Sequence, residues 1–406
     1  MRLLIVVQRY GQQVYGGAEV HAREVAERLV RRGHSVEVLT SCALSYVDWT
    51  NAYMPGTYQE GGVTVHRLAI DRARNHHCFD PLAARVLQRR GEVVYPILRE
   101  WERQQGPYIV ELATWMQEHS PAFDCALFFT YLYFTSWSGL ASVRVPSILQ
   151  PTAHDESSLH YPHFDGVFQL ADAFAFSTRE ERDLVLRRFA TYRPSAVIGI
   201  GIDVDRSVDQ VAFRRRFGLD DRPYVVSIGR IDSAKGSPEL HRDFVRYKAR
   251  HPGPLALVMI GQEVYKLPPH ADVVKTGFVE EAVRNSGIAG ALAMIQPSPF
   301  ESFSLVLCEA WALERPAMVQ RRSAVLVGHA RRSGAALAYG DYPEFETGLD
   351  LLLADHHLRN RMGASGRAYV EAHYSWPAVL DRYERLLERV ARPATASTLR
   401  LAQGRC

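Results

Sequence analysis

Two cations in the second half of the chain are spaced as in loops that hold phosphate groups. Arg230 and Lys235 lie in the glycine-flanked loop 229–236, Gly-Arg-Ile-Asp-Ser-Ala-Lys-Gly. Arginine supplies forked hydrogen bonds and lysine a compact charge, so the pair could clamp a diphosphate and replace a divalent metal. The alternative is that both are ordinary solvent-exposed loop cations.

Two carboxylates accompany a helix that we predict over residues 302–313. Glu301 lies just before this helix and Glu309 about two turns inside it. With about 3.6 residues per turn, their spacing places them on roughly the same side at different heights. Glu301 could then meet a sugar near the helix N-terminus, and Glu309 a neighbouring ribose. The alternative is that Glu301 caps the helix and Glu309 is a surface charge.

Two segments of the first half are further candidates. Gly16-Gly17-Ala18-Glu19 opens a predicted helix, where exposed N–H groups and the helix dipole favour an anion. It lacks the Gly-x-Gly-x-x-Gly spacing of dinucleotide sites, and a flexible turn is the alternative. His154 follows a predicted strand, where a hydrogen-bonded structural histidine is the alternative to a catalytic one.

The elements that position these residues follow from the hydrophobic pattern. Short β-branched runs alternate with helical periodicity, which is typical of parallel sheets covered by helices. Ligands of such sheets bind beyond the carboxyl ends of the strands, where all four candidate segments lie. The predicted strands are 3–7, 35–40, 63–68, 125–130, 147–150, 173–177, 196–198, 224–228, 256–260, 273–275 and 292–296. The predicted helices are 18–32, 82–119, 178–189, 302–313 and 376–390, and long loops are expected at 41–62 and 70–80.

The length of 406 residues predicts two domains, because single hydrophobic cores stop growing at roughly 250–300 residues. The segment Gly199-Ile-Gly-Ile-Asp203 interrupts the alternation and is the predicted hinge. We expect an N-terminal acceptor-side domain at 1–203 and a nucleotide-sugar domain at 204–374. A closing helix at 375–391 would pack back on the first domain, and 392–406 would form a flexible tail.

Composition excludes several classes of protein. A net charge of +3 is too small to indicate nucleic-acid binding. The five cysteines are scattered without a Cys-x-x-Cys pair, so neither disulfides nor a zinc site is expected. No apolar run reaches the roughly 18 residues of a membrane span, and no signal peptide is recognisable, which predicts a cytoplasmic protein. Asp203-Val204-Asp205 matches a metal-binding Asp-x-Asp pattern, but no His or third acid accompanies it, so no metal is expected.

Together these segments resemble the retaining family 4 glycosyltransferases of the GT-B fold. The match is clearest at 16–19, at 229–236 and in Glu301-Ser-Phe-Ser-Leu-Val-Leu-Cys-Glu309-Ala310, and it is weak over 41–145. It implies an α/β chain with two Rossmann-like, doubly wound domains facing a cleft. It also implies a UDP- or GDP-sugar donor as substrate, no cofactor, and a glycan, lipid-linked or small-molecule acceptor. Attack would occur on the face of the leaving group, with a donor phosphate oxygen assisting deprotonation of the acceptor.

The resemblance also assigns roles to residues. It implies that the diphosphate is held by the two cations, the ribose by Glu309 and the donor sugar by Glu301 and His154, with Gly16 and Gly17 approaching the phosphate or sugar. Backbone N–H groups near Ser304 and Leu305 would add anion contacts. The residues so implied in catalysis are Glu301, His154, Arg230 and Lys235.

The chain departs from the family pattern at three places. Phe303-Ser304 stands where Phe-Gly is usual, Gly199–Asp203 replaces a Pro-Asn-Gly-Val-Asp hinge, and 320–326 replaces a glycine-rich segment. A Cβ at residue 304 could narrow the backbone approach to phosphate. A catalytically inactive nucleotide-sugar-binding protein and a GT-B epimerase are therefore alternatives. The helices predicted over 82–103 carry arginine and apolar residues, so peripheral contact with the inner face of the membrane is a further alternative.

Overall fold

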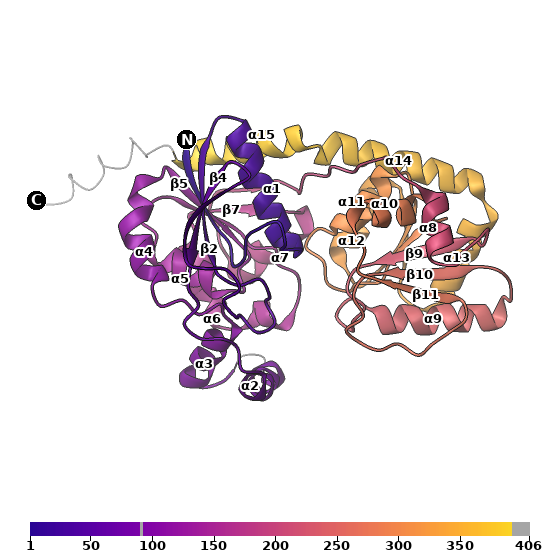
Figure 1. The fold of residues 1–406 in the computed structure, drawn as a ribbon, viewed down its shortest axis with the longest axis horizontal. Helices are drawn as coiled ribbons and strands as arrows, with labels where there is room; N and C mark the ends of the chain where they lie inside the picture. Colours follow the sequence, from indigo (N-terminus) through magenta and orange to yellow (C-terminus); the bar gives the residue numbers. More distant parts are fainter. Residues whose placement is uncertain (90–91, 392–406) are drawn as a thin grey trace, which may run out of the picture. The chain divides into compact units, whose positions relative to one another are not determined.

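Two largely parallel sheets organise the chain in a computed structural model that describes residues 1–89 and 92–391 (Figure 1). The first sheet has eight strands in the order β3-β4-β2-β1-β5-β6-β7-β8 and is parallel except where β3 pairs antiparallel with β4. The second has six parallel strands in the order β11-β10-β9-β12-β13-β14. The predicted α/β fold class with two doubly wound sheets is thereby confirmed.

The central strands of the first sheet are buried on both faces. Leu3, Leu4, Ile5 and Val6 of β1 are all 0% exposed, and alternate side chains of a strand point to opposite faces. Helices must therefore cover both sides. The strands are β1 Arg2–Val6, β2 Ser35–Ser41, β3 Gly56–Glu60, β4 Val63–Leu68, β5 Cys125–Phe129, β6 Ser147–Gln150, β7 Ala173–Phe176 and β8 Ser195–Val197.

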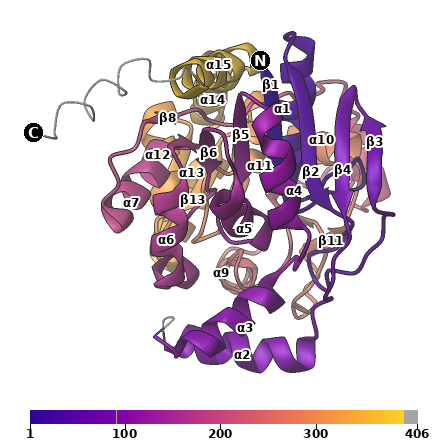
Figure 2. The same ribbon diagram turned by 90° about the vertical axis from the view of Figure 1, so that its left-hand side faces the viewer.

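The helices between these strands include a pair that extends beyond the sheet. Figure 2 shows α2 and α3 below the strands, at the end away from the N-terminus. The helices are α1 Gly17–Arg31, α2 His76–Gln88, α3 Tyr95–Gln105, α4 Leu112–His119, α5 Phe134–Ser142, α6 His163–Leu170 and α7 Arg179–Phe189.

The second sheet repeats the pattern of buried apolar strands. Its strands are β9 Tyr224–Ile228, β10 Ala256–Ile260, β11 Val273–Gly277, β12 Met294–Gln296, β13 Ala317–Gln320 and β14 Ala336–Tyr339. Its helices are α8 Gln210–Arg216, α9 Ser237–Arg250, α10 Glu281–Ala289, α11 Leu305–Ala312, α12 Ala324–Ser333, α13 Tyr342–Ala354 and α14 His356–Tyr374, followed by α15 Trp376–Ala391.

Three sequence-based expectations were wrong. The loop predicted at 41–62 contains β3, an edge strand whose side chains are mostly exposed and so lack an apolar pattern. The loop predicted at 70–80 ends where α2 begins, with the Asn75 side chain accepting the His77 N–H at 3.0 Å. The helix predicted over 82–119 is broken, because Gly106 ends α3 in the left-handed region with a φ of 65° and Pro107 follows.

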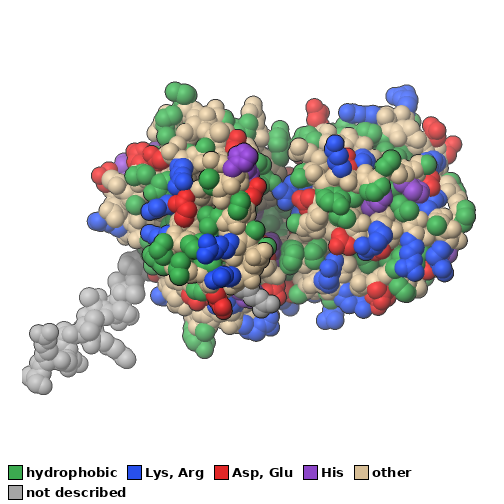
Figure 3. Space-filling model, turned by 90° about the horizontal axis from the view of Figure 1, so that it is seen from below, with side chains coloured by type: hydrophobic (Ala, Val, Ile, Leu, Met, Phe, Trp, Pro, Cys, Tyr) green, Lys and Arg blue, Asp and Glu red, His purple; other side chains and the backbone are tan. Residues whose placement is uncertain are grey.

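The chain divides into two compact units. The first comprises Met1–Ser177, Glu181–Ile198 and the segment that begins at Leu380, and the second Thr178–Glu180 and Gly199–Val379. The domain assignment at 203, 374 and 391 stays a prediction, and the tail predicted at 392–406 lies outside the described residues. Acidic and basic side chains lie beside one another on the face drawn in Figure 3, in keeping with the small net charge.

The second half of α15 is held to the first unit by buried polar contacts. The Tyr383 hydroxyl donates to Gln150 Oε1 and lies 3.0 Å from His21 Nε2 of α1. At the exposed side, Arg32 of α1 pairs with Asp381 and Glu384 at 2.6 Å each. The buried hydroxyl is the more costly group to lose, because its removal leaves Gln150 Oε1 without this donor.

We expect Tyr383→Phe to lower the free energy of unfolding by about 1–3 kcal/mol, the usual cost of an unsatisfied buried polar group. Urea unfolding followed by circular dichroism measures the change. The matched control is Arg389→Ala, which removes an exposed donor to the Ser195 carbonyl at 3.0 Å and should change stability by less than about 0.5 kcal/mol. Equal effects of the two substitutions would contradict a buried polar anchor on α15.

Candidate donor-sugar site

The candidate residues of the second unit follow two strands that are neighbours in its sheet. Met294 of β12 pairs with Val226 of β9, while β10 pairs with the other side of β9. The strand order therefore reverses direction at β9 and β12, and open sheets bind ligands beyond the carboxyl ends of the strands at such a switch point. Arg230 and Lys235 follow β9, and Glu301 and Ser304 follow β12.

Lys235 and Glu301 form an ion pair across this edge of the sheet. Lys235 Nζ donates to Glu301 Oε1 at 2.8 Å, although 66 positions separate the two residues in the chain. The Glu301 side chain is only 10% exposed, whereas that of Lys235 is 37% exposed. The sequence did not predict that the carboxylate and the lysine would neutralise each other.

Arg230 lies in a hollow at the same edge. Its Nε is 3.1 Å from Asp232 Oδ2, and Asp232 Oδ1 accepts the backbone N–H of Lys235 at 2.8 Å. Asp232 therefore connects the Arg230 side chain to the backbone of Lys235. The hollow is polar. Its lining includes Ser227, Gly229, Arg230, Lys235, Gln296 and Pro297.

Glu309 carries an unused acceptor in the same unit. Arg284 of α10 donates to Glu309 Oε1 at 3.0 Å, while Glu309 Oε2 is buried and has no hydrogen-bond partner among the described residues. Burial raises the pKa of Glu309, and Arg284 opposes that rise. A buried oxygen without a partner is costly, so a ligand donor at this position would be favourable.

The turn before α11 differs from the prediction in detail. The helix begins at Leu305 rather than at Ser302, because Ser304 adopts the left-handed conformation with φ 75° and ψ 75°. No side chain caps this helix. The first N–H groups of α11 are therefore left for another acceptor, as helix starts generally require.

The glycine turn of the first unit has no room for a larger residue. Arg9, in the loop after β1, donates to Glu19 Oε1 from Nε at 2.9 Å and from Nη2 at 2.5 Å, in a buried pair. A Cβ on Gly16 would lie 2.1 Å from Glu19 Oε2. Gly17 is the first residue of α1. A side chain at position 16 would therefore require the Glu19 carboxylate to shift within its buried contact with Arg9.

His154 follows β6, two strands from β1 in the same sheet. Its Nδ1 is 3.6 Å from Glu156 Oε1, which accepts the Tyr131 hydroxyl at 2.8 Å. Thr130 and Thr152, at the ends of the adjacent strands β5 and β6, both have positive φ, of 65° and 52°. Backbone strain of this kind clusters at functional sites. Gly16, Gly17 and His154 all lie beyond carboxyl ends of the first sheet.

In the Asp203-Val204-Asp205 segment, the Asp205 carboxylate binds a backbone N–H group. Asp205 Oδ1 accepts the Ser207 N–H at 2.8 Å, and this hydrogen bond lowers the pKa of Asp205. Across residues 1–89 and 92–391, no three His, Cys, Asp or Glu side chains are grouped to hold a metal ion. In that same part of the chain, no helix combines the length and apolar character needed to cross a bilayer.

Comparison with known proteins identifies this arrangement. Residues 222–355 match the family model "Glycosyl transferases group 1". This segment of the second unit belongs to the group 1 glycosyltransferases, and the chain has the two-sheet architecture of the GT-B fold. The predicted enzyme class, a glycosyltransferase, is thereby confirmed.

Relatives and solved structures agree with this assignment. An uncharacterised glycosyltransferase of Methanocaldococcus jannaschii is 23% identical over 93% of this chain and 95% of its own length. A GDP-mannose-dependent alpha-(1-6)-phosphatidylinositol monomannoside mannosyltransferase of Mycolicibacterium smegmatis is 28% identical over 55% of this chain and 64% of its own. The E. coli structure described as trehalose-6-phosphate bound with UDP-2-fluoro glucose has a TM-score of 0.72 at 13% identity, covering 96% and 99% of the two chains.

Sequence reasoning missed several residues of this glycosyltransferase. Gln296 and Arg9 are polar residues at or just beyond the carboxyl ends of buried strands. A search for polar residues at the carboxyl end of every predicted strand would have found both. Asp232 was visible in the Arg230 loop but received no role. Arg284 carried no signal, because only the packing of α10 brings it to Glu309.

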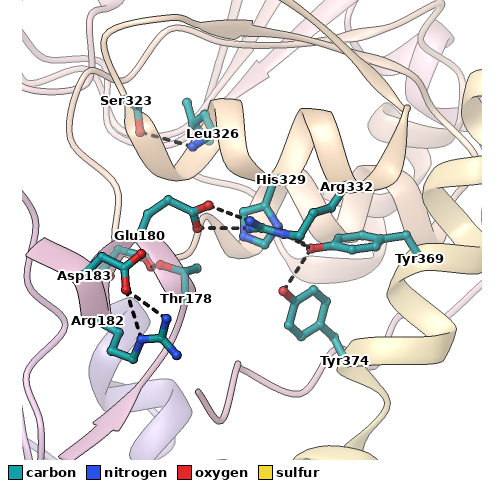
Figure 4. Close-up of polar contacts among 11 residues, drawn as sticks. Thr178, Glu180, Arg182, Asp183, Ser323, Leu326, His329, Arg332, Tyr369 and Tyr374 are labelled. Atoms are coloured by element: carbon teal, nitrogen blue, oxygen red, sulfur yellow. Dashed lines mark hydrogen bonds and ion pairs between the residues drawn. The ribbon is translucent and has the colours of Figure 1, made fainter. Parts of the chain in front are cut away.

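The polar network drawn in Figure 4 contacts the Glu301–Ser304 turn through Thr178. The Thr178 hydroxyl donates to the Ser302 carbonyl at 3.1 Å. Glu180 accepts two hydrogen bonds from Arg332, at 2.5 and 3.0 Å. The Phe303 ring packs edge-on against the rings of His329 and Tyr374.

His329 is the buried titratable group of this network. It is 0% exposed, its Nδ1 lies 3.1 Å from the Tyr369 hydroxyl, and the same hydroxyl accepts from Arg332 Nε and lies 3.1 Å from that of Tyr374. Burial, and to a lesser extent the charge of Arg332, lowers the pKa of His329 from 6.5 to about 3. The imidazole is therefore neutral in the folded glycosyltransferase at any physiological pH.

We expect His329→Gln to reduce the acid sensitivity of the fold. Between pH 6.5 and 3 the unfolded chain binds a proton at His329 that the folded chain does not, so stability is undiminished above 6.5 and falls as the pH drops. At pH 5.0 this residue accounts for about 2 kcal/mol of that fall. Urea unfolding at pH 7.5 and 5.0 should show a smaller difference in the variant by this amount. An unchanged difference would mean that His329 is protonated in the folded state.

Proposed function

We propose that the second unit binds a UDP- or GDP-sugar at the carboxyl ends of β9 and β12. The contact between Lys235 and Glu301 carries this proposal, because it places a phosphate-binding cation and a sugar-binding carboxylate 2.8 Å apart at the switch point of the sheet. The solved E. coli relative, described as bound with UDP-2-fluoro glucose, and the GDP-mannose-dependent relative support a donor of this class.

When the donor binds, its groups replace the contact between Lys235 and Glu301. Lys235 and Arg230 bind the diphosphate, and Glu301, once Lys235 turns to phosphate, accepts hydrogen bonds from sugar hydroxyls. The N–H groups of Ser304 and Leu305 at the start of α11 bind the same phosphate. Each charge thus has one partner before binding and another after it, so neither is left buried and unpaired.

Glu309 recognises the ribose. Its unused Oε2 accepts a ribose hydroxyl, while Arg284 holds Oε1 and opposes the rise in pKa that burial causes. This role leaves Glu309 unable to act as a nucleophile, so no glycosyl-enzyme intermediate forms there.

Transfer requires no dedicated protein base. The bond between the anomeric carbon and the diphosphate oxygen breaks, the acceptor oxygen forms its bond on the same face, and the acceptor proton passes to a phosphate oxygen. Arg230, Lys235 and the first N–H groups of α11 stabilise the negative charge that develops on the leaving diphosphate. Preorganised donors of this kind usually supply the largest catalytic term.

The acceptor is a sugar or a lipid-linked sugar. The phosphatidylinositol mannoside named for the mycobacterial relative supports this class. His154, Gly16 and Gly17 stay predicted contacts of the donor from the first unit. A cytoplasmic location, with peripheral contact at the inner face of the membrane through α2 and α3, stays part of this proposal; exposed Val94 and Tyr95, beside and at the start of α3, support it.

We expect Lys235→Ala and Glu301→Gln to separate binding from transfer. Lys235→Ala removes a charge-assisted phosphate contact and should weaken UDP or GDP binding by roughly 10- to 100-fold in calorimetry. Glu301→Gln should leave that affinity equal or stronger, because it frees Lys235, yet lower kcat by at least about tenfold. Arg230→Ala should behave as Lys235→Ala.

Circular dichroism spectra matching wild type provide the folding control for these variants. Wild-type transfer by both Arg230→Ala and Glu301→Gln would overturn the site assignment.

We expect Glu309→Gln to weaken nucleotide binding through the ribose alone. The variant should bind the preferred nucleoside diphosphate about tenfold more weakly, since a charged acceptor is replaced by a neutral one. With the 2′,3′-dideoxy form of that nucleotide, wild type and variant should bind alike. A loss of equal size for both nucleotides would show that Glu309 acts on the fold or the phosphates and not on the ribose.

A further inference from the structure

Ser304 occupies a backbone conformation that favours glycine. Its φ of 75° lies in the left-handed region, where a side chain is strained. Ser304 is the residue immediately before α11, the place where a serine hydroxyl usually accepts an N–H of the first helical turn. Here no such cap forms, because the left-handed backbone turns the side chain elsewhere.

The hydroxyl is bound to Gln296 instead. Gln296 Nε2 donates to Ser304 Oγ at 2.9 Å, and both residues are buried, at 3% and 4% exposure. A hydroxyl has one proton to donate. Since Ser304 Oγ accepts from Gln296, and makes no other hydrogen bond within the described chain, its proton remains available to a ligand.

Gln296 connects this hydroxyl to the donor-sugar site. It is the last residue of β12 and lines the hollow that contains Arg230 and Lys235. A second unused group lies on the helix that Ser304 precedes, namely the buried Glu309 Oε2. A free donor and a free acceptor on one short helix segment match a ligand that offers both an anion and a hydroxyl, as a nucleoside diphosphate does.

We infer that Ser304 Oγ donates a hydrogen bond to the diphosphate of the donor and that Gln296 is the positioning residue that orients it. This rests on the proposed function, whose phosphate contacts at residue 304 are backbone N–H groups alone. A glycine at this position would offer only its N–H. The serine adds a donor at the expense of backbone strain, and the glutamine fixes the direction of that donor.

The test compares Ser304→Ala with Ser304→Gly by calorimetry with UDP, GDP, UMP and GMP. Both variants lack the hydroxyl, so both should bind the preferred nucleoside diphosphate roughly three- to tenfold more weakly, the effect of one hydrogen bond. Monophosphate binding should not change. Ser304→Gly should also melt at a higher temperature than Ser304→Ala, because glycine relieves the strain.

Tighter diphosphate binding by Ser304→Gly would overturn the inference, since it would show that the Cβ obstructs phosphate. Wild-type affinity in Ser304→Ala, with the loss in Arg230→Ala retained, would overturn it and leave the proposed function intact. Absence of UDP and GDP binding by the wild-type protein would overturn both.

Gln296→Met tests the positioning role, because methionine keeps the length of the side chain and lacks its donor. It should weaken diphosphate binding by about the same factor as Ser304→Ala and have no further effect when combined with it. A Gln296→Met loss that persists in the Ser304→Ala background, or that extends to the monophosphates, would show that Gln296 acts on the fold or directly on the ligand. If Gln296→Met does not fold, the two Ser304 variants still decide whether the hydroxyl is used.

Discussion

The ion pair between Lys235 and Glu301 depends on the order of strands in the second sheet. Only because β9 and β12 are neighbours do residues 66 positions apart meet at 2.8 Å. The pair also explains how the nearly buried carboxylate of Glu301 is stabilised. A carboxylate that is 10% exposed would be costly alone, and the lysine offsets that cost.

Most strands were predictable because a strand that is buried on both faces consists of a short run of apolar residues. β4, β6, β9 and β10 begin and end at the predicted residues. β3 was missed because its side chains face solvent. The helix over 82–119 was predicted as continuous because apolar periodicity continues across Gly106. These two misses concern segments where local backbone conformation or edge pairing, not the core, decides the structure. β13 and β14 were not predicted either, although the side chains of β13 are buried.

The candidate site was predictable in its residues and not in its contacts. Arg230, Lys235, Glu301 and Glu309 were proposed because they follow or flank predicted elements at a sheet edge. Their partners Asp232 and Arg284 were not assigned, since ion pairing between loops and helices depends on side-chain directions that spacing does not give. The same applies to Gln296, whose role emerges only once Ser304 is seen to be left-handed.

The turn from Glu301 to Ser304 is restrained on three sides, and this limits how the donor can be bound. Thr178 holds the Ser302 carbonyl, His329 and Tyr374 enclose the Phe303 ring, and Gln296 holds the Ser304 hydroxyl. A backbone fixed in this way cannot rearrange around phosphate without breaking buried contacts. Adjustment to a ligand must therefore come from the side chains of Lys235 and Glu301, which these buried contacts do not hold.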